Sequence, residues 1–87
     1  MKFTSINEFP TDTPLEVTKS SIDSTLSVGD IVWVDSQDRY LNHLSGGWVS
    51  EEDLTYDTVF SAEFKLNTEY KCFTKGRSTI IIRVDQL

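Results

Sequence analysis

Apolar and polar residues alternate with a period of two along most of this chain, and this pattern predicts short β-strands. The pattern begins after Pro14, where Leu15 and Val17 alternate with polar neighbours. The strongest apolar run, Ile-Val-Trp-Val at 31–34, is apolar on both faces, and we therefore expect a central strand there. No window shows the period of 3.6 that an amphipathic helix requires. The expected strands are 15–18, 31–34, 39–44, 48–49, 57–64, 68–74 and 79–85.

Clusters of glycine, serine and aspartate separate these strands and predict turns. They occur at 28–30, 36–38, 45–47 and 75–78. Ser50 is followed by three acidic residues, which indicates an N-cap and one short helical turn over residues 50–54. Residues 1–13 show neither period, and we expect an irregular N-terminal lead-in before a single β domain over residues 14–87.

Composition supports an all-β fold in one domain. Valine, isoleucine and threonine supply 23 of the 87 residues, whereas alanine occurs once. A chain of this length has room for one hydrophobic core. Its single cysteine, Cys72, cannot form an internal disulfide, which favours a reducing compartment. Because no apolar run approaches the length of a membrane-spanning helix, we expect a soluble, cytoplasmic protein.

The net charge of −6 is unevenly distributed along the chain. Residues 1–64 hold 12 acids and 3 bases, whereas residues 65–87 hold 2 acids and 5 bases. The acidic part repels nucleic-acid phosphate and anionic membranes and attracts basic proteins. The bases after residue 64 alternate over both faces of the expected strands, so they predict no continuous nucleic-acid surface. These are Lys65, Lys71, Lys75, Arg77 and Arg83.

The residue types that carry catalysis or bind metals are scarce. His43 is the single histidine, and no glycine pattern typical of a catalytic serine accompanies it, so we interpret it as an ordinary strand residue. Cys72 is expected to be a small buried apolar residue. Together His43 and Cys72 supply at most two of the four ligands that a zinc site needs. We therefore expect a non-enzymatic protein without cofactor or metal.

Two short segments resemble the SH3-like small β-barrels, including bacterial SH3 domains. They are Leu26-Ser27-Val28-Gly29-Asp30-Ile31-Val32-Trp33-Val34 and Gly46-Gly47-Trp48-Val49-Ser50-Glu51-Glu52-Asp53-Leu54. The resemblance spans about 40 residues, from Leu15 to Leu54, and implies a small barrel with a single 3₁₀ turn near 50–54. The strands after residue 54 exceed those of a minimal barrel and predict an additional C-terminal β-meander. The Ala-Leu-Tyr-Asp-Tyr element of signalling SH3 domains is missing, so binding of proline-rich peptides is not expected.

Acidic residues at the expected turns, with aromatic residues among them, form the candidate binding surface. Acidic side chains spaced like phosphates can occupy the basic groove of a nucleic-acid-binding protein, although the same acids can serve only to keep a small domain soluble. The candidate residues are Asp35, Asp38, Tyr40, Trp48, Glu51, Glu52, Asp53, Tyr56 and Asp57.

The composition, rich in serine, threonine, asparagine and aspartate, resembles that of accessory proteins of bacteriophages or mobile elements. Our hypothesis is therefore a protein-interaction module that inhibits or modulates a host nucleic-acid-binding or defence protein, in the host cytoplasm if phage-encoded. The alternatives are a small virion or tail-assembly subunit that associates through strand edges, or a bacterial SH3-type binding domain. We expect a monomer or a weak homo-oligomer.

Overall fold

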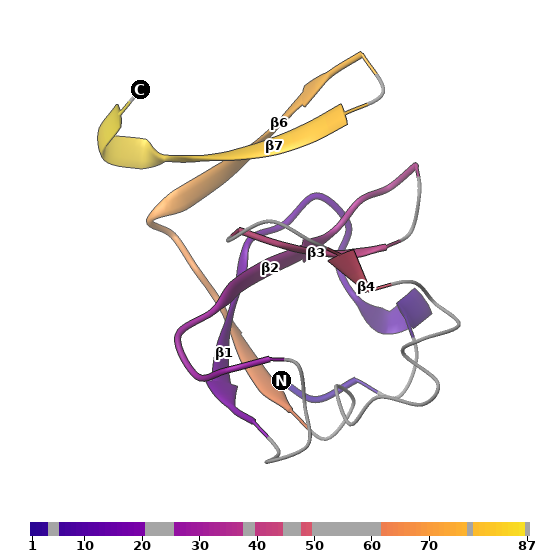
Figure 1. Cartoon of the computed structure of the whole chain (residues 1–87), viewed down its shortest axis with the longest axis vertical. Helices are drawn as coiled ribbons and strands as arrows, with labels where there is room; N and C mark the ends of the chain where they lie inside the picture. The colour runs from indigo at the N-terminus through magenta and orange to yellow at the C-terminus, as the bar shows by residue number, and fades with distance from the viewer. Residues whose placement is uncertain are drawn as a thin grey trace.

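The computed structural model describes residues 1–3, 6–20, 26–37, 40–44, 48–49, 62–76 and 78–86 (Figure 1). The strands form two antiparallel sheets, and the described helices are short 3₁₀ helices. This arrangement confirms the all-β fold class. None of the helical segments in these ranges is long and apolar enough to cross a membrane. The elements are η1 (Ile6–Glu8), β1 (Leu15–Lys19), β2 (Ile31–Val34), β3 (Leu41–His43), β4 (Trp48–Val49), β5 (Glu63–Leu66), β6 (Tyr70–Lys75), β7 (Ser78–Arg83) and η3 (Val84–Gln86).

Five strands form the larger sheet, in the order β4-β3-β2-β1-β5. The sheet curls on itself, with β4 and β5 as its two edges (Figure 1). The run at 31–34 is its middle strand and is buried along its whole length, as its two apolar faces predict. β1 lies between β2 and β5: its residue Leu15 is paired with Val32 on one side and with Leu66 on the other.

The core joins apolar residues of the larger sheet to apolar residues of the N-terminal segment. Leu15 and Val17 are fully buried, whereas Glu16 between them is only partly covered, so the alternation in the sequence does mark the inner face of β1. Phe64 pairs with Val17 and turns its ring into the same core. The core cluster consists of Phe3, Phe9, Leu15, Val17, Leu26, Val32, Val34, Leu41, Ala62 and Phe64.

The N-terminal segment belongs to this core, although nothing in its local pattern indicates a buried element. Phe3 and Phe9 are both buried, and their rings stack with centroids 4.1 Å apart. Both rings also contact Phe64, at centroid distances of 5.6 and 5.5 Å. The backbone N–H of Phe64 donates to the carbonyl oxygen of Met1 over 2.9 Å. The segment expected to be a lead-in therefore packs as part of the domain.

β6 and β7 form a separate two-stranded hairpin beside the larger sheet (Figure 1). Lys75 pairs with Ser78 at its tip, where Gly76 adopts a positive φ of 64°, as the glycine of the expected turn allows. On its inner face Cys72 is half-buried, whereas Phe73 on the outer face is exposed. The expected C-terminal meander is thus divided, because β5 joins the larger sheet and the hairpin does not.

A turn after β5 lies between the larger sheet and the hairpin. Asn67 donates its backbone N–H to the carbonyl oxygen of Pro14 over 3.1 Å, and its side-chain oxygen accepts the N–H of Glu69 over 2.8 Å. These bonds hold the turn that follows β5. The expected helical turn at 50–54 and the first part of the expected strand at 57–64 lie outside the described residues.

Candidate functional site

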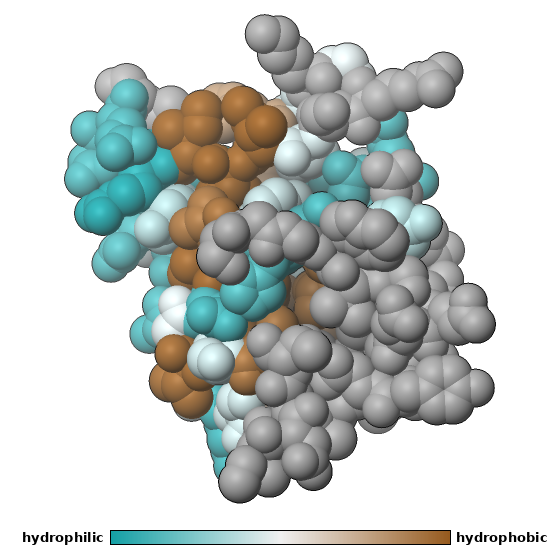
Figure 2. Space-filling view, in the orientation of Figure 1, coloured by the Kyte–Doolittle hydropathy of each residue, from teal (hydrophilic) through white to brown (hydrophobic). Residues whose placement is uncertain are grey.

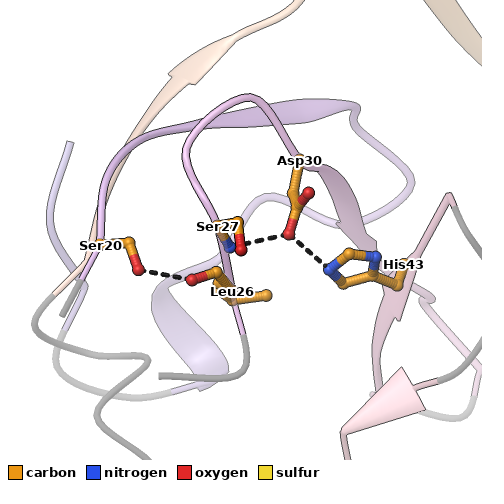
Figure 3. Close-up of polar contacts among 5 residues, drawn as sticks. All are labelled: Ser20, Leu26, Ser27, Asp30 and His43. Carbon is orange, nitrogen blue, oxygen red and sulfur yellow. Dashed lines mark hydrogen bonds and ion pairs between the residues drawn. The ribbon is translucent and has the colours of Figure 1, made fainter. Parts of the chain in front are cut away.

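The turn that leads into β2 holds an aspartate in a defined position. Gly29 has a φ of +95°, which L side chains rarely adopt, so the tight turn depends on glycine. Asp30 makes two hydrogen bonds with Ser27. The N–H of Ser27 donates to Oδ2 of Asp30 over 2.8 Å (Figure 3). The N–H of Asp30 donates to the Ser27 carbonyl oxygen over 3.0 Å. Val17 ties the same turn to β1 through two backbone bonds of 2.9 Å. The Asp30 carboxylate is therefore preorganised.

His43 lies across the sheet from this turn. Its strand, β3, pairs with β2 so that His43 stands opposite Val32. The imidazole Nε2 lies 2.9 Å from Oδ2 of Asp30, and the two side chains are 20% and 27% exposed (Figure 3). Oδ2 of Asp30 thus has two neighbours, Ser27 and His43, while its Oδ1 accepts no hydrogen bond within the described part of the chain. One carboxylate oxygen is left for a further donor.

A cleft of about 260 Å³ opens beside this pair. Its apolar walls come from Ile31 and from Leu44, which is 41% exposed. Tyr70, the first residue of β6, supplies the wall on the other side, so the cleft lies where the two sheets meet. The residues that line it are Gly29, Asp30, Ile31, His43, Leu44 and Tyr70.

A second set of polar contacts joins Asp12 to the hairpin. Asp12, at a φ of 53°, accepts hydrogen bonds at Oδ1 from the N–H of Ser36 (3.2 Å) and from Oγ1 of Thr79 (3.4 Å). Burial, together with the negative charges of Asp12 and Asp35, raises the pKa of the Cys72 thiol to about 11. Because the thiolate is the reactive form, this environment suppresses nucleophilic chemistry at Cys72. Among the residues that the structure describes, no group of three or more histidine, cysteine, aspartate or glutamate side chains is placed to hold a metal ion.

The structure describes three of the nine candidate binding residues. Asp35 is only 5% exposed, and its Oδ1 accepts the N–H of Gln37 over 2.7 Å. It therefore differs from the exposed acid expected at this position, because it stabilises the turn between β2 and β3. The backbone carbonyl oxygen of Tyr40 accepts the N–H of Asp35 over 3.3 Å, and Tyr40 is 37% exposed. Trp48 begins the edge strand β4. The other candidates lie outside the described residues: Asp38, Glu51, Glu52, Asp53, Tyr56 and Asp57.

The cleft residues Asp30, His43 and Tyr70 were missed as a group by sequence reasoning. A signal for the first two exists, because antiparallel pairing of the strands at 31–34 and 41–43 brings His43 next to the start of the central strand. No local signal exists for Tyr70, which reaches the cleft from the second sheet.

In comparisons with known proteins, no protein-family model, no curated protein and no solved structure matches this chain.

Proposed function

We propose that this chain is a non-enzymatic interaction module that binds a protein partner with a basic surface through its acidic five-stranded unit. One observation carries the proposal: the division of charge coincides with the division into sheets. Residues 1–66, which contain the five strands, hold 12 acids and 4 bases, whereas residues 67–87, which contain the hairpin, hold 2 acids and 4 bases. A surface dominated by one sign of charge speeds the encounter with an oppositely charged partner.

The acids of the five-stranded unit are not equally available. On β1 and β5, Glu16 lies 3.5 Å from Lys65 and Glu63 lies 3.9 Å from Lys19, so the charges there compensate one another. The sequence between β4 and β5 holds four acids and no base: Glu51, Glu52, Asp53 and Asp57. These four acids and Asp30 each carry a negative side chain, and in this proposal a basic partner supplies the complementary charge.

The biological role that we propose follows the resemblances in the sequence. An acidic module with SH3-like segments and a composition similar to that of phage accessory proteins fits an inhibitor or modulator of a host nucleic-acid-binding or defence protein. In this proposal the acidic residues occupy the basic groove that otherwise receives nucleic-acid phosphate.

The test reverses the charge of Glu51, Glu52 and Asp53 to lysine and compares capture of basic proteins from host lysate at low and high salt. We expect the parent protein to capture a basic partner less well as salt rises, because counterions screen the interaction, and we expect the triple variant to lose it. The matched control reverses Glu69, an exposed acid before the hairpin that makes no ion pair with a described residue. Salt-independent capture that the triple variant retains would contradict the proposal.

One further observation favours a second candidate, a structural subunit that associates with copies of itself. Phe73 and Ile80 face each other across the hairpin and are 38% and 44% exposed on its outer side. Figure 2 shows hydrophobic residues at the surface where β6 and β7 lie. Sedimentation of the purified protein distinguishes the two candidates: assembly that resists salt and is abolished by Ile80→Lys supports the subunit, and a monomer at all salt concentrations excludes it.

A further inference from the structure

We infer that the cleft between the two sheets binds the side chain of one lysine or arginine of the basic partner. The inference rests on the proposed function and names the contact through which the partner is recognised. It combines three features of the cleft: its size, its apolar walls and the free oxygen of Asp30.

Size restricts the occupant. Pockets for cofactors and drug-sized ligands typically enclose roughly 300 to 1,000 Å³. The cleft, at about 260 Å³, lies below this range and suits one extended side chain. Lysine and arginine combine a long apolar stem with a charged end, so a mixed lining matches them better than it matches a purely apolar or purely polar ligand.

The walls match the two parts of such a side chain. Ile31 and Leu44 offer apolar surface to the aliphatic stem. Tyr70 adds an aromatic ring, which attracts cations through its negative face. Oδ1 of Asp30 is the acceptor for the charged end, because the turn fixes the carboxylate and the neighbours Ser27 and His43 both lie at Oδ2. An ion pair formed beside apolar walls is screened less than one on an open surface.

Arg83, a described cation paired with the cleft residue Tyr70, is engaged elsewhere. Arg83 pairs with Tyr70 across the hairpin, but its Nε lies 3.2 Å from Oδ1 of Asp85. This contact directs the guanidinium toward the C-terminal 3₁₀ helix η3. The Asp30 carboxylate makes no ion pair with a lysine or arginine of the described residues, and the place of that cation is left to the partner.

The test titrates the full chain with single-residue probes and follows backbone amides by two-dimensional NMR. The probes are Nα-acetyl-lysine amide and Nα-acetyl-arginine amide, and Nα-acetyl-norleucine amide is the uncharged control. We expect both cationic probes to shift the amides of Gly29, Leu44 and Tyr70, with dissociation constants of about 1 mM. Norleucine amide should bind more weakly by about 10-fold, because it lacks the charge-assisted hydrogen bond.

Variants of Asp30 and Leu44 test the assigned contacts. Asp30→Asn keeps an oxygen that can accept the N–H of Ser27 but removes the charge, and should weaken binding of the cationic probes by about 10-fold. Leu44 is exposed at the cleft, so it can be changed with little risk to folding. Leu44→Lys should weaken binding by repulsion, and Leu44→Glu should strengthen it. Leu66→Lys, at a residue that is 58% exposed on β5, is the matched control and should bind as the parent does.

The outcomes separate this inference from the proposed function. Equal binding of norleucine amide, or cationic binding that neither Asp30→Asn nor Leu44→Lys weakens, overturns the cleft assignment even if capture of basic proteins remains sensitive to salt and to reversal of Glu51, Glu52 and Asp53. Specific binding of the cationic probes supports the cleft assignment. If capture of basic proteins is at the same time unaffected by salt and by the triple reversal, the proposed acidic surface is overturned.

Discussion

Replacement of Phe9 by alanine tests whether the N-terminal segment stabilises the fold. Phe9 is 4% exposed and contacts Phe3 and Phe64 at centroid distances of 4.1 and 5.5 Å. Transfer of a phenylalanine side chain from water contributes about 1.5 to 3 kcal/mol, and the cavity left by truncation raises the cost to about 3 to 5 kcal/mol. A chain of this size has a free energy of unfolding of about 4 to 13 kcal/mol. Phe9→Ala should therefore remove a large share of the stability.

Urea denaturation followed by tryptophan fluorescence measures this loss as a lower midpoint at an unchanged slope. Thr11→Ala is the matched control, because Thr11 is exposed in the same segment and pairs with Val34 through its backbone. We expect its stability to equal that of the parent within about 0.5 kcal/mol. A Phe9→Ala variant that loses less than about 1 kcal/mol would refute the assignment of the N-terminal segment to the core.

Two further predictions concern the side chains of Trp33 and Cys72. Trp33 is 8% exposed, so Trp33→Ala should lower the free energy of unfolding by about 3 to 5 kcal/mol in urea denaturation, and parent-like stability would show that this side chain is not packed. The pKa of the Cys72 thiol, about 11 instead of the ordinary 9.0, should slow its alkylation at about pH 8 by roughly 10- to 100-fold relative to the urea-unfolded chain, because fewer thiols are ionised although each thiolate is more nucleophilic. Asp12→Asn should partly restore the rate, because Asp12 contributes to the raised pKa. Equal rates in folded and unfolded protein would contradict the partial burial of Cys72 on the inner face of the hairpin.

Strand positions could be predicted from local pattern, because the alternation of apolar and polar residues within a strand involves only residues adjacent in the sequence. Alternation at 15–18 and the apolar run at 31–34 correspond to β1 and β2. The expected hairpin at 68–85 corresponds to β6 and β7, with Lys71 and Phe73 on the exposed face as the alternation predicts. Its turn was predictable because Gly76 accepts a positive φ that other residues resist.

The candidate site was harder to predict because its parts come from distant places in the chain. Asp35 carries a charge and follows a buried strand, which favours exposure, yet it is buried because its carboxylate bonds to the backbone of the next turn. Tyr70 lies 40 residues after Asp30, and local sequence cannot indicate that the second sheet brings them to one cleft.

The sequence by itself determined the all-β class, the inner and outer faces of the strands and the division between an acidic and a basic part. These properties depend on residues one or two positions apart and on composition, so they need no knowledge of the fold. Tertiary structure alone decided that β5 joins the first sheet, that Phe3 and Phe9 complete its core and that Asp30, His43 and Tyr70 line one cleft. Each of these depends on contacts between segments far apart in the chain, and such contacts form only when the whole core is buried at once.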